Sequence, residues 1–493
     1  MSISEKIKEV FPDGCVLKSR KYEALFNGRN LPAFVKDFIL RKHTDKQGVV
    51  NVEMIKQYLI DKMPSDPELL KQTLMNKGSV NITTRFTVNT DMARAMVRFT
   101  MSDVNINTDA FVSPEVLEKN KDILTDCEHW GNITLVYVEP EGRRKGYVLM
   151  TSYIAFNPYS KIDIPYFMKG RENFTTEEWI DFLVATMEYN PDEFTEEQKR
   201  EVISRLLPLV EPRLNMIELG PKGTGKSYVF LNLSKYAWLL AGGRTTRAKL
   251  FYNKASKQFG VLKKYDVVGI DEITTFQFTD PDEMQSIMKS YLEAGKAAVD
   301  NVMFQSECGL MLLGNIPLDK DFKPLNPSYV KELPEMFRDS ATLDRFHGFI
   351  EGWKMPRLSK DHIMEGWVFN CEYFSSILHR LRFDSEYDEM FSELVEIPHG
   401  CDLRDKKAIQ RITAAYHKLI FPHVRSLSDL EPEQVDMFKH LYDRYCLQPA
   451  IRRRQIIRDQ CHRIDKEFKP EVSPFSVVGL TDVQKADDSM QQS

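Results

Sequence analysis

The sequence predicts an α/β protein: a parallel αβα core, and before it a mixed α/β domain containing a small β-barrel or sheet. Three observations support this prediction. Short stretches with alternating apolar residues, separated by turns, occur before residue 157. Between residues 214 and 353, apolar strand-like runs alternate with helical segments, as expected of a parallel αβα domain. Within that region, a glycine-rich loop joins a predicted strand to a predicted helix.

The first domain, expected over residues 1–172, begins with helical patterns and continues with strands. Residues 84–88 and 95–101 form one predicted hairpin, and residues 132–138 and 146–156 form a second. Several short strands joined by turns are typical of a small barrel or sheet.

Capping boxes mark the boundary that follows. Thr175 and Thr195 are each followed three residues later by Glu or Gln, so a helix is expected to begin at each. The remaining boundaries follow from changes in pattern: a helical linker over 173–212, the αβα core over 213–356, a helical lid with C-terminal helices over 357–470, and a disordered tail over 471–493.

Composition excludes several classes of protein. The net charge of −5 gives no overall attraction to nucleic acid, so any such binding needs local basic patches. There is no apolar run of about 18 residues and no secretory signal, so neither a membrane span nor export is expected. The seven cysteines are scattered without C-x-x-C, which predicts a reduced, cytoplasmic protein without disulfides or structural zinc.

The glycine-rich loop fits the pattern G-x-x-x-x-G-K-[ST] at every fixed position. Its glycines allow backbone N–H groups to surround phosphates, and the next helix presents its positive N-terminus. We therefore expect ATP here, with Lys226 on the β- and γ-phosphates and the Ser227 hydroxyl on Mg²⁺. The predicted nucleotide-binding residues are Gly220, Pro221, Lys222, Gly223, Thr224, Gly225, Lys226 and Ser227.

Polar residues follow the next predicted strands. In "YDVVGIDE", Asp271 suits a Mg²⁺ ligand and Glu272 suits a general base that orients the attacking water. Asn315 ends the strand "GLMLLGN" and is expected to contact the γ-phosphate or that water. Arg345 is the predicted arginine that reaches a neighbouring subunit's nucleotide, with Arg338 in reserve; the alternative for each is a structural ion pair.

These elements, in this order, resemble the AAA+ ATPases. The stretches "FTTEEWIDFLV", "ELGPKGTGKS", "AGGRTTRAKLFYN", "YDVVGIDE" and "LDRFHGFIEGW" more narrowly resemble BrxL, the Lon-like ATPase family of BREX bacteriophage-exclusion systems. The resemblance covers most of the chain, up to "RDKKAIQRITAAYHKLIFPH" and "IRRRQIIRDQ".

The resemblance implies a ring-forming ATPase that acts on DNA, with a core similar to that of the minichromosome maintenance helicases. It implies an N-terminal domain that helps to bind duplex DNA, a homo-oligomeric ring of six or seven subunits, and other phage-defence subunits as partners. Many family members carry a C-terminal Lon-protease-like domain. This chain ends where that domain would begin, and no P-S-A-G motif follows residue 356, so peptidase activity is not expected.

The cargo is expected to be DNA rather than peptide. Where peptide-threading ATPases place an aromatic–hydrophobic–glycine loop, this chain has Gly242–Thr246, with a cation and no aromatic residue. In the similar helicases a pore hairpin carries a lysine on the DNA backbone, a role that Lys296 would take here; otherwise it is a solvated lysine. Arg143, Arg144 and Lys145 form a predicted hairpin tip that clamps phosphates or merely protects an edge.

Other arginines leave alternatives open. Arg404 and Arg411 lie in the predicted lid, where such ATPases often carry a nucleotide-sensing arginine, and the sequence does not choose between them. The segment "AIRRRQIIRDQCHR" is predicted to be a helix with a solvated basic face; the alternatives are a contact with DNA or with a neighbouring subunit. The same motifs also suit a protein-remodelling ATPase, or an ATP-gated DNA-binding assembly without motor activity.

Overall fold

The computed structural model describes residues 1–29, 31–45, 48–63, 66–91, 96–101, 104–106, 109–120, 128–142, 145–155, 162–254, 258–299 and 301–480. The chain divides into two compact units. Unit 1 consists of Met1–Asp13, Ile162–Met364 and Phe374–Ser493, and unit 2 of Gly14–Lys161 and Glu365–Tyr373. Each unit therefore combines segments that are distant in the sequence.

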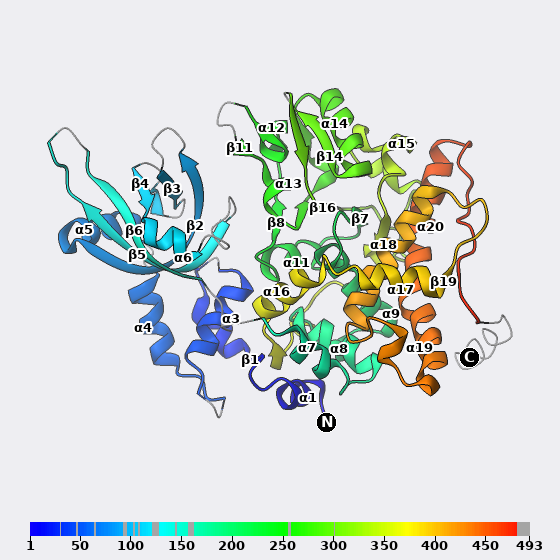
Figure 1. Cartoon of the computed structure of the whole chain (residues 1–493), viewed down its shortest axis with the longest axis horizontal. Coiled ribbons are helices and arrows are strands. Elements are labelled where there is room, and N and C mark those ends of the chain that lie inside the picture. Colours follow the sequence, from blue (N-terminus) through cyan, green and yellow to red (C-terminus); the bar gives the residue numbers. More distant parts are fainter. Residues whose placement is uncertain are drawn as a thin grey trace. The chain divides into compact units, whose positions relative to one another are not determined.

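The main feature of unit 2 is a closed five-stranded β-barrel with the strand order β2-β3-β4-β6-β5 (Figure 1). All pairings are antiparallel except that of β4 with β6. Phe86, Phe99 and Ile133 lie in the core of the barrel, which confirms the barrel predicted from the two hairpins. The strands are β2 Ser79–Asp91, β3 Met96–Thr100, β4 Ala110–Val112, β5 Glu128–Val138 and β6 Tyr147–Ala155.

Helices pack around this barrel. Leu70 and Leu74 of α5 and Val116 of α6 belong to its hydrophobic core. A separate antiparallel pair joins β1 (Cys15–Lys18) to β18 (Gly366–Phe369), which brings a late segment of the chain into unit 2. The helices of this unit are α2 Arg20–Glu23, α3 Ala33–Lys42, α4 Val52–Lys62, α5 Pro67–Lys77 and α6 Pro114–Asn120.

The main feature of unit 1 is a five-stranded parallel sheet with the order β17-β7-β16-β12-β8. All four pairings are parallel, so the carboxyl ends of the strands lie along one edge, where ligands bind in open α/β sheets. The parallel sheet expected from the alternating apolar runs is therefore present. Its strands are β7 Met216–Leu219, β8 Ala237–Leu240, β12 Val267–Ile270, β16 Gly309–Gly314 and β17 Gly348–Glu351.

Helices and short hairpins complete unit 1. Side chains of α14 and α20 share one hydrophobic core cluster with the sheet. The remaining elements are α1 Ile3–Val10, α7 Ile164–Arg171, α8 Thr176–Thr186, α9 Glu196–Ile203, α10 Leu207–Val210, α11 Lys226–Asn232, β9 Arg244–Thr245, α12 Arg247–Leu250, β10 Tyr252–Asn253, β11 Gln258–Phe259, α13 Val261–Lys264, β13 Gln277–Phe278, α14 Pro281–Ala294, β14 Lys296–Val299, β15 Val302–Gln305, α15 Ser340–Leu343, α17 Glu386–Leu394, β19 Val395–Glu396, α18 Leu403–Ile420, α19 Val435–Tyr442, α20 Gln448–Ile464 and β20 Ser476–Val477; α16 (Cys371–Leu381) continues from unit 2.

Both predicted capping boxes are confirmed. The Thr175 side chain accepts a hydrogen bond from the backbone N–H of Glu178, and the Thr195 side chain accepts one from Gln198. Each reciprocal bond is also present, so two backbone donors are satisfied at each helix start.

The arginine-rich helix α20 differs from its prediction. Arg453, Arg454 and Arg458 are buried rather than solvated. Arg454 pairs with Asp344 and Asp405, and Arg458 also pairs with Asp405. These carboxylates lie far away in the sequence, so the local pattern gave no sign that they neutralise the helix.

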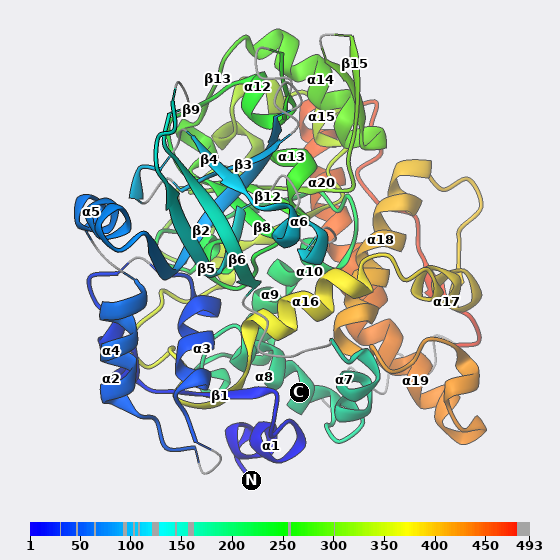
Figure 2. The same cartoon turned by 60° about the vertical axis from the view of Figure 1, so that its left-hand side comes forward.

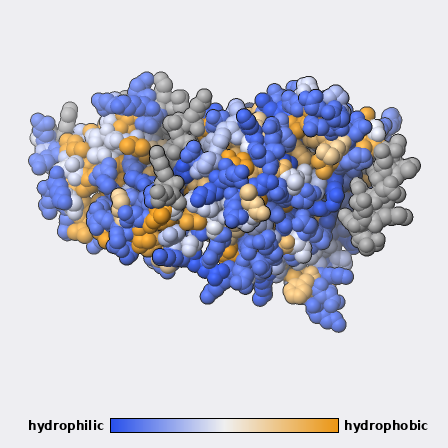
Figure 3. Space-filling model, turned by 90° about the horizontal axis from the view of Figure 1, so that it is seen from below, coloured by the Kyte–Doolittle hydropathy of each residue, from blue (hydrophilic) through white to orange (hydrophobic). Residues whose placement is uncertain are grey.

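Hydrophilic residues dominate the face of the molecule in Figure 3, with smaller apolar areas between them, which is ordinary for a protein surface. Among the described residues, no helix combines the length and apolar character needed to cross a bilayer. Of the predicted disordered tail, residues 471–480 are described and include β20, which pairs with β19, so this part differs from the prediction. The rest of the predicted tail lies outside the described residues, which end at residue 480.

Candidate nucleotide-binding site

The loop between β7 and α11 depends on glycine at defined positions. Gly223 has φ +84° and Gly225 has φ +76°, in the left-handed region that glycine enters at little cost. Gly220 meets a different constraint, because a Cβ added there would lie 2.5 Å from the backbone carbon of Gly352. The loop therefore turns back sharply after β7 and starts α11 at the carboxyl edge of the sheet.

Lys226, the first residue of α11, is 7% exposed. Its Nζ donates to the carbonyl oxygens of Gly220 at 3.0 Å and Pro221 at 2.7 Å, and to Oδ1 of Asn315 at 3.4 Å. Burial lowers the pKa of Lys226, and the charge of Glu218 opposes this effect. None of the three acceptors carries a formal charge, so the ammonium remains available to a phosphate.

Ser227 and Asp271, the two predicted metal ligands, are in contact. The Ser227 hydroxyl donates to Oδ2 of Asp271 at 2.6 Å. Asp271 directly follows β12, so both oxygens lie at the carboxyl edge of the sheet. Hydroxyl and carboxylate oxygens are ligands that Mg²⁺ accepts, so this pair fits the predicted ion.

Glu272, the predicted base, has an unusual backbone conformation. Its φ of 49° and ψ of 40° lie in the left-handed region, which is uncommon for a residue other than glycine and is often found at functional sites. Its N–H donates to Oδ1 of Asp271 at 2.9 Å, and its side chain is exposed. The turn thus directs two consecutive carboxylates differently: Asp271 toward Ser227 and Glu272 toward solvent.

Asn315 follows the strand that lies between the loop strand and the acidic strand. β16 pairs with β7 on one side and β12 on the other, and the Asn315 side chain reaches Lys226. The structure therefore brings together Lys226, Ser227, Asp271 and Asn315, with Glu272 next to them in the chain.

Arg345, the predicted trans-acting arginine, lies at the other edge of the same sheet. β17 is in register with β7, from Gly348 opposite Met216 to Glu351 opposite Leu219. Arg345 comes before β17, whereas the glycine-rich loop comes after β7. Four residues at about 3.3 Å each separate the two edges, so Arg345 lies away from the loop of its own subunit.

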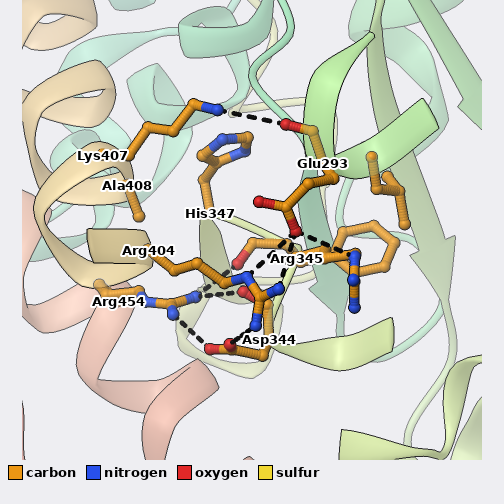
Figure 4. A pocket seen from close by; sticks show the side chains of 10 residues that line it. Glu293, Asp344, Arg345, His347, Arg404, Lys407, Ala408 and Arg454 are labelled. Carbon is orange, nitrogen blue, oxygen red and sulfur yellow. Dashed lines mark hydrogen bonds and ion pairs between the residues drawn. The ribbon is translucent and has the colours of Figure 1, made fainter. Parts of the chain in front are cut away.

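A single carboxylate joins Arg345 to a second arginine (Figure 4). Oε2 of Glu293 lies 3.1 Å from Nε of Arg345 and accepts from Nε and Nη2 of Arg404, at 3.1 and 2.9 Å. Arg345 also donates to the carbonyl oxygen of Ala341, and Arg404 donates to Asp344 at 2.9 Å. We call Glu293, Arg345 and Arg404 the arginine clasp.

The two lid arginines occupy different environments. Arg404 is 38% exposed, and although burial works to lower its pKa, Asp344 and Glu293 raise it overall. Arg411 is 14% exposed and contacts Glu211 and the carbonyl oxygen of Pro212. Burial lowers the pKa of Arg411. Only Arg404 is in the arginine clasp; the reserve candidate Arg338 donates to the carbonyl oxygen of Leu333 at 2.6 Å.

Several residues around the glycine-rich loop, and one beside Arg345, were not predicted from the sequence. Glu218 of β7 and Arg205 form a fully buried ion pair at 2.6 Å. Glu218 itself was the sequence signal for this buried pair, because it is a carboxylate within an apolar strand directly before the loop. Tyr189 places its hydroxyl 3.5 Å from the carbonyl oxygen of Gly225. Glu293 was also missed, because nothing in the sequence links it to Arg345.

The predicted DNA contacts are only partly described. Lys296 is exposed and is the first residue of the β14–β15 hairpin, paired with Gln305. The turn lies beyond Val299 and Val302, so Lys296 is at the base of the hairpin and not at its tip. Lys145 is exposed, whereas Arg143 and Arg144 lie outside the described residues.

Comparison with known proteins identifies the family. A family model described as "Lon-like protease BrxL-like, ATPase domain" matches residues 148–473, and one described as "BREX system Lon protease-like protein BrxL N-terminal" matches residues 9–137. A relative from Escherichia coli O9:H4 (strain HS), named Lon-like protease BrxL, is 28% identical over 416 residues, which cover 83% of this chain and 59% of the relative.

A protein of the same name from Bacillus cereus (strain H3081.97) is 26% identical over 417 residues, covering 83% of this chain and 61% of the relative. The chain thus spans less than two thirds of the length of these two relatives. The resemblance found in the motifs is confirmed over nearly the whole described chain. The protein belongs to the BrxL family of BREX components and contains the ATPase domain of that family.

Proposed function

We propose that this protein is an AAA+ ATPase that forms a ring and couples ATP hydrolysis to translocation or remodelling of duplex DNA in BREX-type phage defence. The observation that carries the proposal is the group of polar side chains at the carboxyl edge of the parallel sheet. The glycine-rich loop supplies N–H groups and α11 supplies Lys226, while Asp271 and Glu272 directly follow β12 and Asn315 directly follows β16.

Each residue has a role that its position supports. Lys226 would bind the β- and γ-phosphates, and Ser227 with Asp271 would hold Mg²⁺, which neutralises phosphate charge when bound. Glu272 would accept a proton from the attacking water, and Asn315 would orient that water or the γ-phosphate. The contact of Lys226 with Asn315 supports this grouping.

The position of Arg345 supports a homo-oligomer. An arginine at the amino edge of the sheet is poorly placed for the phosphates of its own subunit but suitable for those of a neighbour. A closed ring of six or seven copies would give every pocket such an arginine. Arg404, beside it in the arginine clasp, is the better candidate of the two lid arginines for sensing that nucleotide.

A local concentration of cations supports DNA as the cargo. From Leu219 to Tyr265 the chain has ten Lys and Arg and no Asp or Glu, although acids outnumber bases overall, 72 to 67. The β10–β11 hairpin in this segment packs on the hairpin that starts with Lys296, with Phe259 and Phe304 ring centroids 6.0 Å apart. The exposed Lys249, Lys254 and Lys296 would attract phosphates without reading the base sequence.

The test is ATP hydrolysis with and without duplex DNA, together with DNA binding in a salt series. Neutralising the exposed Lys249, Lys254 and Lys296 should weaken binding and make the slope of log affinity against log salt shallower by about 0.9 for each phosphate that the variant no longer neutralises. Replacing Lys71, an exposed-face lysine of α5 that pairs with Glu68, is the control and should change neither quantity.

The alternatives give different results. A protein-remodelling ATPase would hydrolyse ATP at a rate that DNA does not change, and an ATP-gated assembly without motor activity would bind DNA with slow, unstimulated turnover. A parent protein that binds no DNA would contradict the proposal. Cytoplasmic location and absence of peptidase activity stay predictions; release of fluorescent fragments from labelled casein by the purified chain would contradict the second.

A further inference from the structure

The loop after β16 forms a short hairpin. Leu318 pairs with Pro324, and the backbone N–H of Asp319 donates to the carbonyl oxygen of Lys323 at 2.8 Å. The Asp319 side chain also closes the turn, because its Oδ1 accepts from the N–H groups of Asp321 and Lys323, at 2.8 and 2.9 Å. Hydrogen bonds within the hairpin therefore fix the shape of its tip.

Phe322 lies at the tip of this segment, residues 318–325, which we call the Phe322 hairpin. Its φ of 57° is in the left-handed region, an outlier for a bulky side chain. Phe322 is 67% exposed, and Leu325, at the end of the hairpin, is 64% exposed. Folding favours neither a strained turn nor two apolar side chains in water, so both observations indicate a surface that binds a partner.

A pocket of about 410 Å³ lies elsewhere in the same unit, within the size range of sites that enclose a ligand. It is lined by the start of α18, by α20 and by the chain that follows α20. The helices α18 and α20 lie side by side (Figure 2). The walls of the pocket have both signs of charge and one aromatic ring: Asp402, Arg404, Arg458, Glu467, Phe468 and Lys469.

Arg458 gives the pocket an unmet hydrogen-bonding group. The side chain is 7% exposed, and its Nη2 lies 3.0 Å from Oδ2 of Asp405. Its Nε is also buried and, within the described residues, has no hydrogen-bond partner. The ring centroid of Phe468 is 5.7 Å from the guanidinium carbon. A buried donor without a partner is unfavourable, so the pocket suits an occupant that brings an acceptor and a flat apolar group.

The Phe322 hairpin and this pocket lie toward opposite edges of the parallel sheet. The hairpin begins three residues after Asn315, which follows β16 at the carboxyl edge. The pocket includes Asp344 and Arg404, which are beside Arg345 at the amino edge. Two different surfaces of one chain can form a repeated heterologous contact, which generates a ring when it closes. In the proposed ring, the amino edge of one copy would meet the carboxyl edge of the next, so the same approach would bring a hairpin to a pocket.

We propose that the Phe322 hairpin of one copy inserts into this pocket of the next copy in the ring. Phe322 would pack on Phe468, and the carboxylate of Asp321 would supply the acceptor that Nε of Arg458 lacks. The inference rests on the proposed ring and deepens it, because it names the residues through which neighbouring copies contact each other.

The charges of the hairpin also match those of the pocket. Asp321 and Lys323 flank Phe322, and the pocket offers both cations and carboxylates. A segment with both signs of charge suits such a pocket better than a simple anion does. The contact would also link Asn315, on one side of a nucleotide, to Arg404 of the next copy, on the other side.

The test is light scattering of the full chain over a range of protein concentrations, with Mg²⁺ and a non-hydrolysable ATP analogue. Phe322→Ala should raise the concentration at half-assembly by about 10- to 100-fold, the range expected when an interface loses a buried aromatic anchor. Ser473→Trp should fill the pocket and cause a similar loss, and the two changes together should add little, since they remove one contact. The matched control is Phe383→Ala, at another exposed phenylalanine of unit 1 (62%), which should assemble like the parent.

A thiol cross-link locates the contact. Cys401 is partly exposed and lies between Gly400 and Asp402, which both line the pocket. Lys320→Cys adds a thiol to the hairpin but keeps Phe322 in place. A short bismaleimide should therefore join neighbouring copies of the Lys320→Cys protein, and Cys401→Ser in the same chain should abolish the product.

The outcomes separate this contact from the ring itself. A parent that assembles, with Phe322→Ala assembling at the same concentration, would overturn the contact and leave the proposed ring intact. A parent that stays monomeric at every concentration would overturn both. A cross-link that survives Cys401→Ser would place the hairpin elsewhere and overturn the pocket as its site.

Discussion

The cations at the two edges of the parallel sheet in unit 1 have different kinds of partner: neutral oxygens at one edge and a carboxylate at the other. At the carboxyl edge, Lys226 is held by two carbonyl oxygens and an amide oxygen, all neutral. At the amino edge, Arg345 and Arg404 share one carboxylate, that of Glu293 (Figure 4). Within the described residues Lys226 forms no ion pair, whereas Arg345 and Arg404 at the amino edge both pair with Glu293.

In the proposed ring, the two edges would form different halves of one catalytic site. The carboxyl edge would receive phosphates, and the arginines of the amino edge would act on the nucleotide of a neighbour. A single chain would contain both halves at opposite ends of its strands, because β17 is in register with β7. Hydrolysis should depend on contact between copies, which the following experiments test.

The largest effect is expected from Arg345→Ala. The arginine matters mainly for charge that develops during phosphoryl transfer, so hydrolysis should fall by about 10³-fold or more while ATP affinity stays near that of the parent. Steady-state hydrolysis and equilibrium nucleotide binding measure the two quantities separately.

Mixing experiments determine whether this arginine acts between copies. Assemblies of Arg345→Ala with Lys226→Ala chains should recover part of the activity, since some interfaces then combine an intact loop with an intact arginine. Zero recovery in assemblies shown to be mixed would count against action in trans. If Arg338→Ala lost ATP hydrolysis and Arg345→Ala did not, Arg338 would be the trans-acting arginine.

Glu272→Gln should lower hydrolysis by about 10²- to 10⁴-fold, because an amide cannot accept the proton of the attacking water. ATP binding should persist, since Asp271 and Ser227 remain in contact. The matched control is Glu283→Gln, on α14, which removes a carboxylate that pairs with Arg247. Turnover at the parent rate in Glu272→Gln would show that the base has been assigned wrongly.

Lys226→Ala should weaken ATP binding by about 10- to 100-fold, the range for removing one hydrogen bond to a charged group. Lys222→Ala is a close control, because Lys222 has the same charge in the same loop but is exposed. Nucleotide titration of both variants compares a buried with an exposed lysine. Equal weakening in the two would mean that the loop contributes only general charge.

Much of the carboxyl edge could be predicted from the sequence because the information there is local. The loop pattern fixes Lys226 and Ser227, and an apolar run that ends in a polar residue gives Asp271 and Asn315. Parallel pairing then brings these ends to the same edge without any further information. The barrel was predictable for a similar reason, since alternation and turns define its hairpins.

The amino edge could not be predicted in this way, because its contacts are long-range. Glu293 and Arg404 are in contact although they are 111 positions apart in the sequence, and Arg454 contacts Asp344 at a separation of 110 positions. A run such as "IRRRQ" has the same appearance in a solvated helix and in a buried ion-pair network. The register of the β14–β15 hairpin was equally hidden, so the sequence could not show that Lys296 lies at its base.

The smallest expected effect comes from Glu293→Gln, which tests the arginine clasp directly. Glutamine keeps nearly the shape of glutamate but removes the charge that attracts both arginines. Exposed ion pairs contribute about 0.2–1 kcal/mol, so the substitution should raise turnover of the assembled protein by only about 1.5- to 5-fold. Turnover should rise because the charge of Glu293 would no longer compete with the phosphates of a neighbour for Arg345.

The dependence on Arg345 is more informative than the size of the effect. If Glu293 acts by restraining Arg345, the same substitution in an Arg345→Ala chain should leave the residual rate unchanged, since two groups in one contact are not additive. Glu283→Gln, nearer the start of the same helix, should leave turnover unchanged in both backgrounds. A fall in turnover would mean that Glu293 positions Arg345 for catalysis, so that the clasp is the active arrangement. An equal change with and without Arg345 would assign the effect to Arg404, the other arginine on the same carboxylate.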